Sequence, residues 1–152
     1  MTPHQIELVQ SSFRLVQPIL DDAAVIFYNR LFELDPSLRS LFRSAREEQA
    51  RKLAQALTVV VKSLDRPDQI RDAVEALGRR HAGYGVRDEH YTTVGTALLW
   101  TLEAGLGAAF TPDVRHAWSA VYGWLAYTMR RAAAISAPAE TISPHTPAQA
   151  VA

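Results

Sequence analysis

Cysteine is absent from the 152-residue chain, and lysine is nearly so. Without cysteine the protein has no disulfide, no thiolate nucleophile, no thiolate metal ligand and no thiol for covalent attachment of a cofactor. Lys52 and Lys62 are its two lysines, so arginine carries most of the positive charge. Acidic and basic residues balance to a net charge of zero, with a pI of about 7.0. This balance argues against nucleic acid and anionic membranes as partners.

Long apolar runs are also missing. No uncharged stretch reaches the roughly 18 residues that a membrane-spanning helix needs. The polar start, Met1 to Gln5, lacks the basic region and apolar run of a signal peptide. Hydrophobic residues make up 48% of the chain and charged residues 21%, as in ordinary globular domains. We therefore expect a cytoplasmic protein with no membrane contact, either a monomer or a weak homodimer.

The apolar residues recur at spacings of three and four, which predicts α-helices. The run Val59-Val60-Val61 is β-branched, but helix-forming neighbours from Gln49 to Ala56 favour a helix there too. The expected helices begin at Thr2-Pro3, after Pro18, near Gln49, at Pro67, at Asp88 and at Thr111-Pro112, with a short helical turn over Leu38 to Phe42. The sequence thus predicts an all-α domain of six main helices, too uneven in length for a simple four-helix bundle.

The last part of the chain differs in composition. From Ile135 onward Ser, Pro, Thr and Ala dominate, and few large apolar residues are left to pack. The last helix is expected to end between Arg131 and Ala134. We therefore divide the chain into a folded domain, residues 1–134, and a tail, residues 135–152, that is predicted to be disordered.

The stretch from Leu77 to Val86 carries the strongest chemical signal. His81 continues the apolar face of Ile70, Val74 and Leu77, and Gly83 and Gly85 then interrupt the helix. A lone histidine in this setting is either a core residue bonded to a carbonyl or a metal ligand. Haem iron needs a neutral imidazole on a rigid helix, in an apolar slot, with its second nitrogen hydrogen-bonded. The Leu77 carbonyl and the Tyr91 hydroxyl are the two candidate partners for that nitrogen.

Several stretches, in this order and spacing, resemble the globin family. They are Phe27 to Phe32, Leu41-Phe42, Gln49 to Leu53, Leu77 to Val86, Tyr91 to Gly95, and Ala117 to Gly123. The chain is most similar to single-domain bacterial globins related to the haem domain of flavohaemoglobins, and also resembles neuroglobins. The resemblance covers about residues 5 to 131. It implies the globin fold, with helices around a haem b (iron protoporphyrin IX).

The resemblance also implies roles for individual residues. His81 matches the ligand of the haem iron, Tyr28 and Gln49 match the polar residues on the opposite, ligand-binding side, and Tyr91 matches the tyrosine that orients the imidazole. The implied haem-binding residues are His81, Phe42, Leu53, Lys52, Leu77, Val86, Tyr91 and Val94, with Lys52 or Arg80 reaching a propionate. Judged without the resemblance, Tyr28 fits a core tyrosine and Gln49 a solvated residue of a first helical turn.

Two departures from the family pattern matter. Flavohaemoglobin-type globins complete a His–Tyr–Glu arrangement with a glutamate in the last helix, and the matching position here is Ala133. We expect this to weaken electron donation to the iron. The chain also contains no FAD- or NAD-binding domain, so electrons are expected from a separate reductase. Arg79-Arg80 fits either a solvated helix face or a docking patch for an acidic reductase.

These features predict a protein that binds O₂, CO and NO, with high affinity for O₂ because Tyr28 and Gln49 donate hydrogen bonds to it. The same donors suit nitric oxide dioxygenation with an external reductant. A gas or redox sensor acting on a separate partner is the alternative, and a haem-free interaction module is a third. Because Gln49 replaces a distal histidine, we expect a five-coordinate ferrous iron. The other histidines (His4, His90, His116 and His145) fall at the termini or in first helical turns and offer no replacement.

Overall fold

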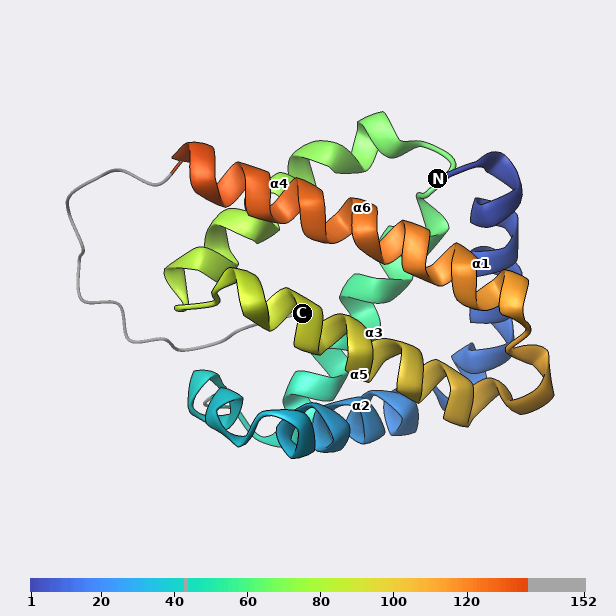
Figure 1. Cartoon of the computed structure of the whole chain (residues 1–152), viewed down its shortest axis with the longest axis horizontal. Helices are drawn as coiled ribbons and strands as arrows, with labels where there is room; N and C mark the ends of the chain where they lie inside the picture. The colour runs from blue at the N-terminus through green and yellow to red at the C-terminus, as the bar shows by residue number, and fades with distance from the viewer. Residues whose placement is uncertain (43, 137–152) are drawn as a thin grey trace.

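A computed structural model describes residues 1–42 and 44–136, and the described chain is all-α with no strand (Figure 1). Its α-helices are α1 (Pro3–Val16), α2 (Leu20–Leu34), α3 (Arg46–Lys62), α4 (Pro67–Gly83), α5 (Asp88–Leu106) and α6 (Pro112–Ser136). Three short 3₁₀ helices join them: η1 (Gln17–Ile19), η2 (Pro36–Leu41) and η3 (Gly107–Ala109). The predicted fold class and its six main helices are confirmed. Among the described residues, no helix combines the length and hydrophobicity required to cross a lipid bilayer.

In the sequence, the polar stretch from Arg43 to Glu48 fits either a connector or a first helical turn. α3 begins within it, at Arg46, with Glu47 and Glu48 in a first turn where the helix dipole favours acidic side chains. Another helix is longer than the sequence predicted. α6 continues to Ser136, past the predicted end, because the alanines that follow Arg131 are strong helix formers. The rest of the predicted disordered tail, residues 137–152, lies outside the described residues.

Most helix ends follow their local chemistry. Thr2 forms the predicted cap of α1: its hydroxyl accepts the Gln5 N–H at 3.1 Å, and the Gln5 side chain accepts the Thr2 N–H at 2.9 Å. The start of α5 differs from the prediction, since Asp88 and Glu89 lie in its first turn and do not cap it. The N-cap residue is Arg87, and its N–H donates to Nδ1 of His90 at 2.9 Å.

The helices pack in pairs that leave a space between them. α6 crosses the molecule with α4 and α1 against it, while α2 packs against α5 and α3 (Figure 1). One core cluster gathers around Trp118 of α6, whose Nε1 donates to the Ser12 hydroxyl at 2.8 Å. A second cluster gathers around Tyr28 and Leu31 of α2. The functional site described below lies between these clusters, walled by residues of both.

The crossing of α4 and α6 depends on Gly78. A methyl group at this position would overlap the backbone of Met129, which cannot move aside as a flexible side chain can. We expect Gly78→Ala to lower the free energy of unfolding by about 1–3 kcal/mol or more, as overpacking does. Gly123→Ala is the matched control, because its new methyl group would meet nothing within 4 Å. That substitution should stabilise α6 by up to about 1 kcal/mol. Urea unfolding of both variants measures the difference, and equal effects would contradict the tight crossing.

Candidate functional site

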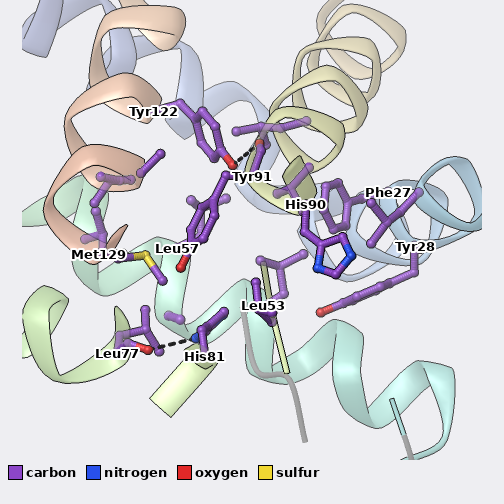
Figure 2. Close-up of a pocket in the computed structure, with 18 of the residues that line it drawn as sticks. Phe27, Tyr28, Leu53, Leu57, Leu77, His81, His90, Tyr91, Tyr122 and Met129 are labelled. Atoms are coloured by element: carbon purple, nitrogen blue, oxygen red, sulfur yellow. Dashed lines mark hydrogen bonds between the residues drawn. The ribbon is translucent and has the colours of Figure 1, made fainter. Parts of the chain in front are cut away.

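A large apolar cavity occupies the centre of the helical shell. Its empty space is about 1200 Å³ when the solvent-filled mouth is counted. The wall is almost entirely aliphatic and aromatic, with His81, His90 and three tyrosine hydroxyls as its polar side-chain groups. The lining residues are Phe27, Tyr28, Leu31, Leu38, Leu41, Phe42, Leu53, Ala56, Leu57, Val60, Val61, Leu77, His81, Val86, His90, Tyr91, Val94, Leu98, Trp118, Val121, Tyr122, Leu125, Ala126 and Met129. Figure 2 shows this cavity between α2, α3, α4, α5 and α6.

His81 stands near the end of α4 with one ring nitrogen engaged. Its Nδ1 lies 2.8 Å from the Leu77 carbonyl oxygen (Figure 2). Because a carbonyl can only accept, Nδ1 carries the proton and the lone pair of the neutral ring sits on Nε2. Burial is the main cause that lowers the pKa of His81 to about 4. The ring is therefore neutral at pH 7, with Nε2 available to a metal.

Of the two partners considered for the His81 ring, the structure selects Leu77. The Tyr91 side chain lines the same cavity, but its hydroxyl makes no hydrogen bond to another described residue. Tyr91 is instead held through its backbone, since the Tyr122 hydroxyl donates to the Tyr91 carbonyl at 2.6 Å. Figure 2 draws the Tyr91 ring between Tyr122 and the Leu77–His81 pair. An orienting role for the Tyr91 hydroxyl remains a prediction.

The turn after α4 fixes both His81 and the next stretch of wall. The His81 carbonyl accepts the N–H groups of Tyr84 and Val86, each at 3.1 Å. This close return of the chain requires Gly85, whose φ of 91° lies in the left-handed region that other residues resist. The predicted glycine corner is confirmed at Gly85. Gly83 is simply the last residue of α4, with no positive φ.

Tyr28 and Gln49 are buried without partners. Both are 2% exposed, and neither the Tyr28 hydroxyl nor either polar atom of the Gln49 amide has a hydrogen-bond partner among the described residues. Buried polar groups of this kind cost about 1–3 kcal/mol each when left unsatisfied, so both side chains are suited to hydrogen-bond a ligand. Burial raises the pKa of Tyr28, which keeps its hydroxyl protonated and able to donate.

The predicted site residues are largely brought together. Eight of them line the central cavity: Tyr28, Phe42, Leu53, Leu77, His81, Val86, Tyr91 and Val94. Gln49 lines a smaller neighbouring cavity that shares Tyr28 and Phe42 with the central one. Lys52 lines neither cavity, and its amine lies 3.8 Å from the Glu48 carboxylate one turn earlier.

His90 is the functional candidate that sequence reasoning missed. The sequence places it in the first turn of a later helix, where side chains usually face solvent, yet it is 5% exposed and lines the same cavity as His81. Its Nδ1 accepts the Arg87 N–H, so the neutral ring carries its proton on Nε2. The spacing of the sequence already indicates this burial, because His90 shares one helix face with the apolar Val94 and Leu98.

The donor set suits an iron that brings its own equatorial ligands. The described residues contain no cluster of three or more His, Cys, Asp or Glu side chains able to hold a bare metal ion. What they offer is one neutral imidazole with a free Nε2, a slot of apolar side chains, and unpaired polar groups of Tyr28 and Gln49. A haem meets each of these features, and its flat apolar ring fits the wall.

The fold and the cavity define an all-α protein built to enclose a flat apolar cofactor beside a helical histidine. Residues 25–129 match the family model described as Globin, and the chain belongs to the globin family. The resemblance inferred from the sequence is thereby confirmed. Solved structures agree: an engineered carbene transferase from Rhodothermus marinus, described as a candidate nitric oxide dioxygenase, is 29% identical with a TM-score of 0.80. That match covers 89% of this chain and 94% of the other.

Other relatives point the same way. A bacterial globin from Campylobacter jejuni shares the fold, with a TM-score of 0.77 and 24% identity over 88% of this chain and 97% of that one. Flavohemoproteins of Xylella fastidiosa and Bacillus subtilis are 33% and 32% identical over 85% and 80% of this chain. The matches cover 33% and 31% of those longer proteins, so the chain spans about a third of the curated relatives it matches.

Proposed function

We propose that this globin holds a haem b and binds O₂, CO and NO reversibly, with high affinity for O₂, and that it converts NO to nitrate when a separate reductase supplies electrons. The observation that carries the proposal is the pairing of a neutral His81 with two buried, unpaired polar side chains, Tyr28 and Gln49. The sequence similarity to flavohemoproteins supports haem as the cofactor. Haem, when bound, supplies the iron at which diatomic gases bind.

His81 would hold the haem through Nε2. The hydrogen bond from Nδ1 to the Leu77 carbonyl keeps the ring in the required tautomer and orientation. It also adds electron density to the imidazole, but a neutral carbonyl does so less than a carboxylate would. Ala133, where related proteins carry glutamate, adds no such charge. These residues favour stable binding of gases over cleavage of the O–O bond.

Tyr28 and Gln49 would act on the bound gas. O₂ accepts electron density on binding, and the Tyr28 O–H and Gln49 N–H groups are buried donors with no other partner among the described residues. A hydrogen bond to a charged acceptor is worth about 1.5–3 kcal/mol, so two donors slow O₂ release substantially. Bound CO develops less negative charge than bound O₂ and is stabilised less by the same hydrogen bonds. The two donors therefore favour O₂ over CO.

The reaction with NO is balanced by one external electron. NO, O₂ and one electron together give nitrate, so each turnover needs one electron, for which the proposal names a separate reductase. The exposed Arg79 and Arg80, at the end of α4 beside His81, suit an acidic reductase. The chain's own residues hold O₂ in place, exclude water through the apolar wall, and keep the Tyr28 proton in position.

Spectra and NO consumption together test the proposal. The purified protein, supplied with haem, should show a five-coordinate ferrous spectrum, because an amide at position 49 does not compete with imidazole for iron. Its O₂ complex should consume one equivalent of NO and form nitrate in a stopped-flow experiment. Slow re-reduction that a ferredoxin or flavodoxin reductase accelerates would support the need for a separate partner.

Different outcomes point elsewhere. Absence of a Soret band after haem supplementation would leave a haem-free interaction module. Reversible O₂ binding without nitrate formation would leave O₂ storage or sensing. A six-coordinate, low-spin ferrous spectrum would contradict the assigned distal side, and His90→Ala would then show whether the second buried histidine supplies the extra ligand.

A further inference from the structure

A small polar cavity adjoins the central one on the side of Gln49. We call it the vestibule and define it by its lining: Tyr28, Phe32, Arg39, Phe42, Ser44, Arg46 and Gln49. Its empty space, open mouth included, is about 390 Å³, room for a small ion with some water. Tyr28 and Phe42 line both cavities, so the vestibule lies directly beside the part of the pocket assigned to the bound gas.

Two arginines give the vestibule a positive charge. Arg39 comes from η2 and Arg46 is the first residue of α3. Within residues 1–42 and 44–136 neither guanidinium pairs with a carboxylate, and no carboxylate lines the vestibule. Both side chains are exposed at the mouth. An anion that enters therefore meets two cations with no competing internal charge.

The arginine from η2 is held in place by aromatic rings. The Arg39 guanidinium lies 5.0 Å from the centre of the Phe32 ring, a cation–π contact that leaves its edge N–H groups available. Phe32 is in turn packed on Phe42, with ring centres 5.5 Å apart, and on Tyr28, at 6.1 Å. Arg39 therefore lies against a group of packed rings that includes Tyr28, a lining residue of both cavities.

Polar groups deeper in the vestibule lack partners. Gln49 lines this cavity and not the central one, and its buried amide has neither donor nor acceptor satisfied. α3 begins three residues before Gln49, at Arg46, and its N-cap residue Ala45 makes no side-chain cap. Amide N–H donors, a hydroxyl and two guanidinium groups together match a small anion that offers several oxygen acceptors.

The geometry points to the vestibule as a binding site for a small, singly charged oxyanion such as nitrate, positioned where the product of the proposed reaction would leave. The choice of nitrate rests on the proposed function, whereas the anion site itself rests on Arg39, Arg46 and Gln49. Nitrate is planar and carries three oxygen acceptors, which suits bidentate guanidinium groups. The vestibule shares Tyr28 and Phe42 with the central pocket and carries the exposed Arg39 and Arg46, so an anion formed in the central pocket would find two positive charges next to it.

Nuclear magnetic resonance of the haem-loaded, CO-bound ferrous protein tests the site, because this state is diamagnetic. Sodium nitrate replaces sodium chloride at constant total salt, while the side-chain N–H signals of Arg39, Arg46 and Gln49 are followed. We expect saturable shifts confined to these groups. Arg39→Gln/Arg46→Gln should weaken nitrate binding at least about tenfold, the effect of losing one or two charge-assisted bonds. Arg39→Lys/Arg46→Lys keeps the charge and should lose less.

Arg14→Gln is the matched control, since Arg14 is an exposed arginine on α1, bonded to Ser11 and absent from the vestibule. It should bind nitrate like the unaltered protein. Shifts that do not saturate, or that appear equally at Arg14, would show non-specific association and overturn the site. Unchanged nitrate affinity in Arg39→Gln/Arg46→Gln would do the same.

NO consumption by the same proteins separates this inference from the proposed function. A protein that binds nitrate saturably at Arg39 and Arg46 but forms none from NO and O₂ keeps the anion site and loses the dioxygenase. A protein that forms nitrate but shows no saturable binding keeps the dioxygenase and loses the site. Faster nitrate release in Arg39→Gln/Arg46→Gln than in Arg14→Gln, at equal O₂ affinity, would support both.

Discussion

Replacing His81 with glycine is expected to abolish iron coordination by the protein and to lower haem affinity by at least about 100-fold. Removing a hydrogen-bond partner of a metal ligand costs about 10- to 100-fold in metal affinity, and removing the ligand itself should cost more. The reason is that the described residues place a single neutral imidazole on α4 with Nε2 free and Nδ1 bonded to Leu77. His90, the other buried histidine of the cavity wall, accepts the Arg87 N–H at Nδ1, so its neutral ring carries the proton on Nε2 and has no free nitrogen to replace His81. Haem content per protein and the Soret spectrum measure the loss.

Rescue makes this experiment specific. Free imidazole fits the space that the His81 side chain vacates, so millimolar imidazole should restore the absorption spectrum of His81→Gly. His116→Gly is the matched control, because His116 is exposed on α6 and lies away from the cavity wall. It should keep full haem content without imidazole. A His81→Gly protein that stays red and spectrally native with no added imidazole would remove His81 from the iron, and the other assigned roles with it.

The sequence allowed the proximal side to be predicted because its determinants are local. The apolar face that ends in His81, and the glycine corner after it, all lie within about three turns of one helix and the turn that follows it. Hydrogen bonding from the ring to Leu77 is likewise an interaction between residues four positions apart. Only the choice between Leu77 and Tyr91 needed the structure, because Tyr91 belongs to another helix and its reach depends on how α4 and α5 pack.

The ligand-binding side was harder to predict because it depends on contacts between distant segments. Gln49 sits in the first turns of α3, which usually face solvent, and its burial follows from η2 and α2 folding over it. The vestibule likewise combines residues of α2, η2 and α3, whose arginines look like ordinary surface charges in the sequence. His90 is a different case, because its evidence is local. Its spacing of four from Val94 indicates a buried face, whereas its place in the first turn of a helix indicates exposure, and the two signals conflict.

The two unpaired groups of the ligand-binding side should make the protein less stable and its O₂ complex more stable. An unsatisfied buried hydroxyl destabilises the folded state by about 1–3 kcal/mol, and the penalty disappears once a ligand accepts the hydrogen bond. Tyr28 and Gln49 are therefore expected to oppose folding of the haem-free protein and to favour gas binding. Stability and affinity should respond to their replacement with opposite signs.

Tyr28→Phe is expected to raise the O₂ dissociation rate about 10- to 150-fold, the equivalent of losing a charge-assisted hydrogen bond of about 1.5–3 kcal/mol. The same change should increase the free energy of unfolding of the haem-free protein by about 1 kcal/mol, because a buried unpaired group is removed without leaving a cavity. Gln49→Leu should act in the same two directions. Flash photolysis measures the dissociation rate, and urea unfolding measures the stability.

Tyr122→Phe is the matched control for both quantities, the O₂ dissociation rate and the free energy of unfolding. Tyr122 lines the same cavity, but its hydroxyl already donates to the Tyr91 carbonyl at 2.6 Å. Its loss should destabilise the protein by about 1 kcal/mol and leave O₂ release nearly unchanged, the reverse of the Tyr28 pattern. If both donors reach the same oxygen atom, the double variant Tyr28→Phe/Gln49→Leu should raise the O₂ dissociation rate by less than the two single-variant factors multiplied together. If Tyr28→Phe destabilised the haem-free protein while leaving O₂ release unchanged, Tyr28 would be a structural tyrosine like Tyr122, and the ligand-binding side would have to be sought elsewhere in the cavity.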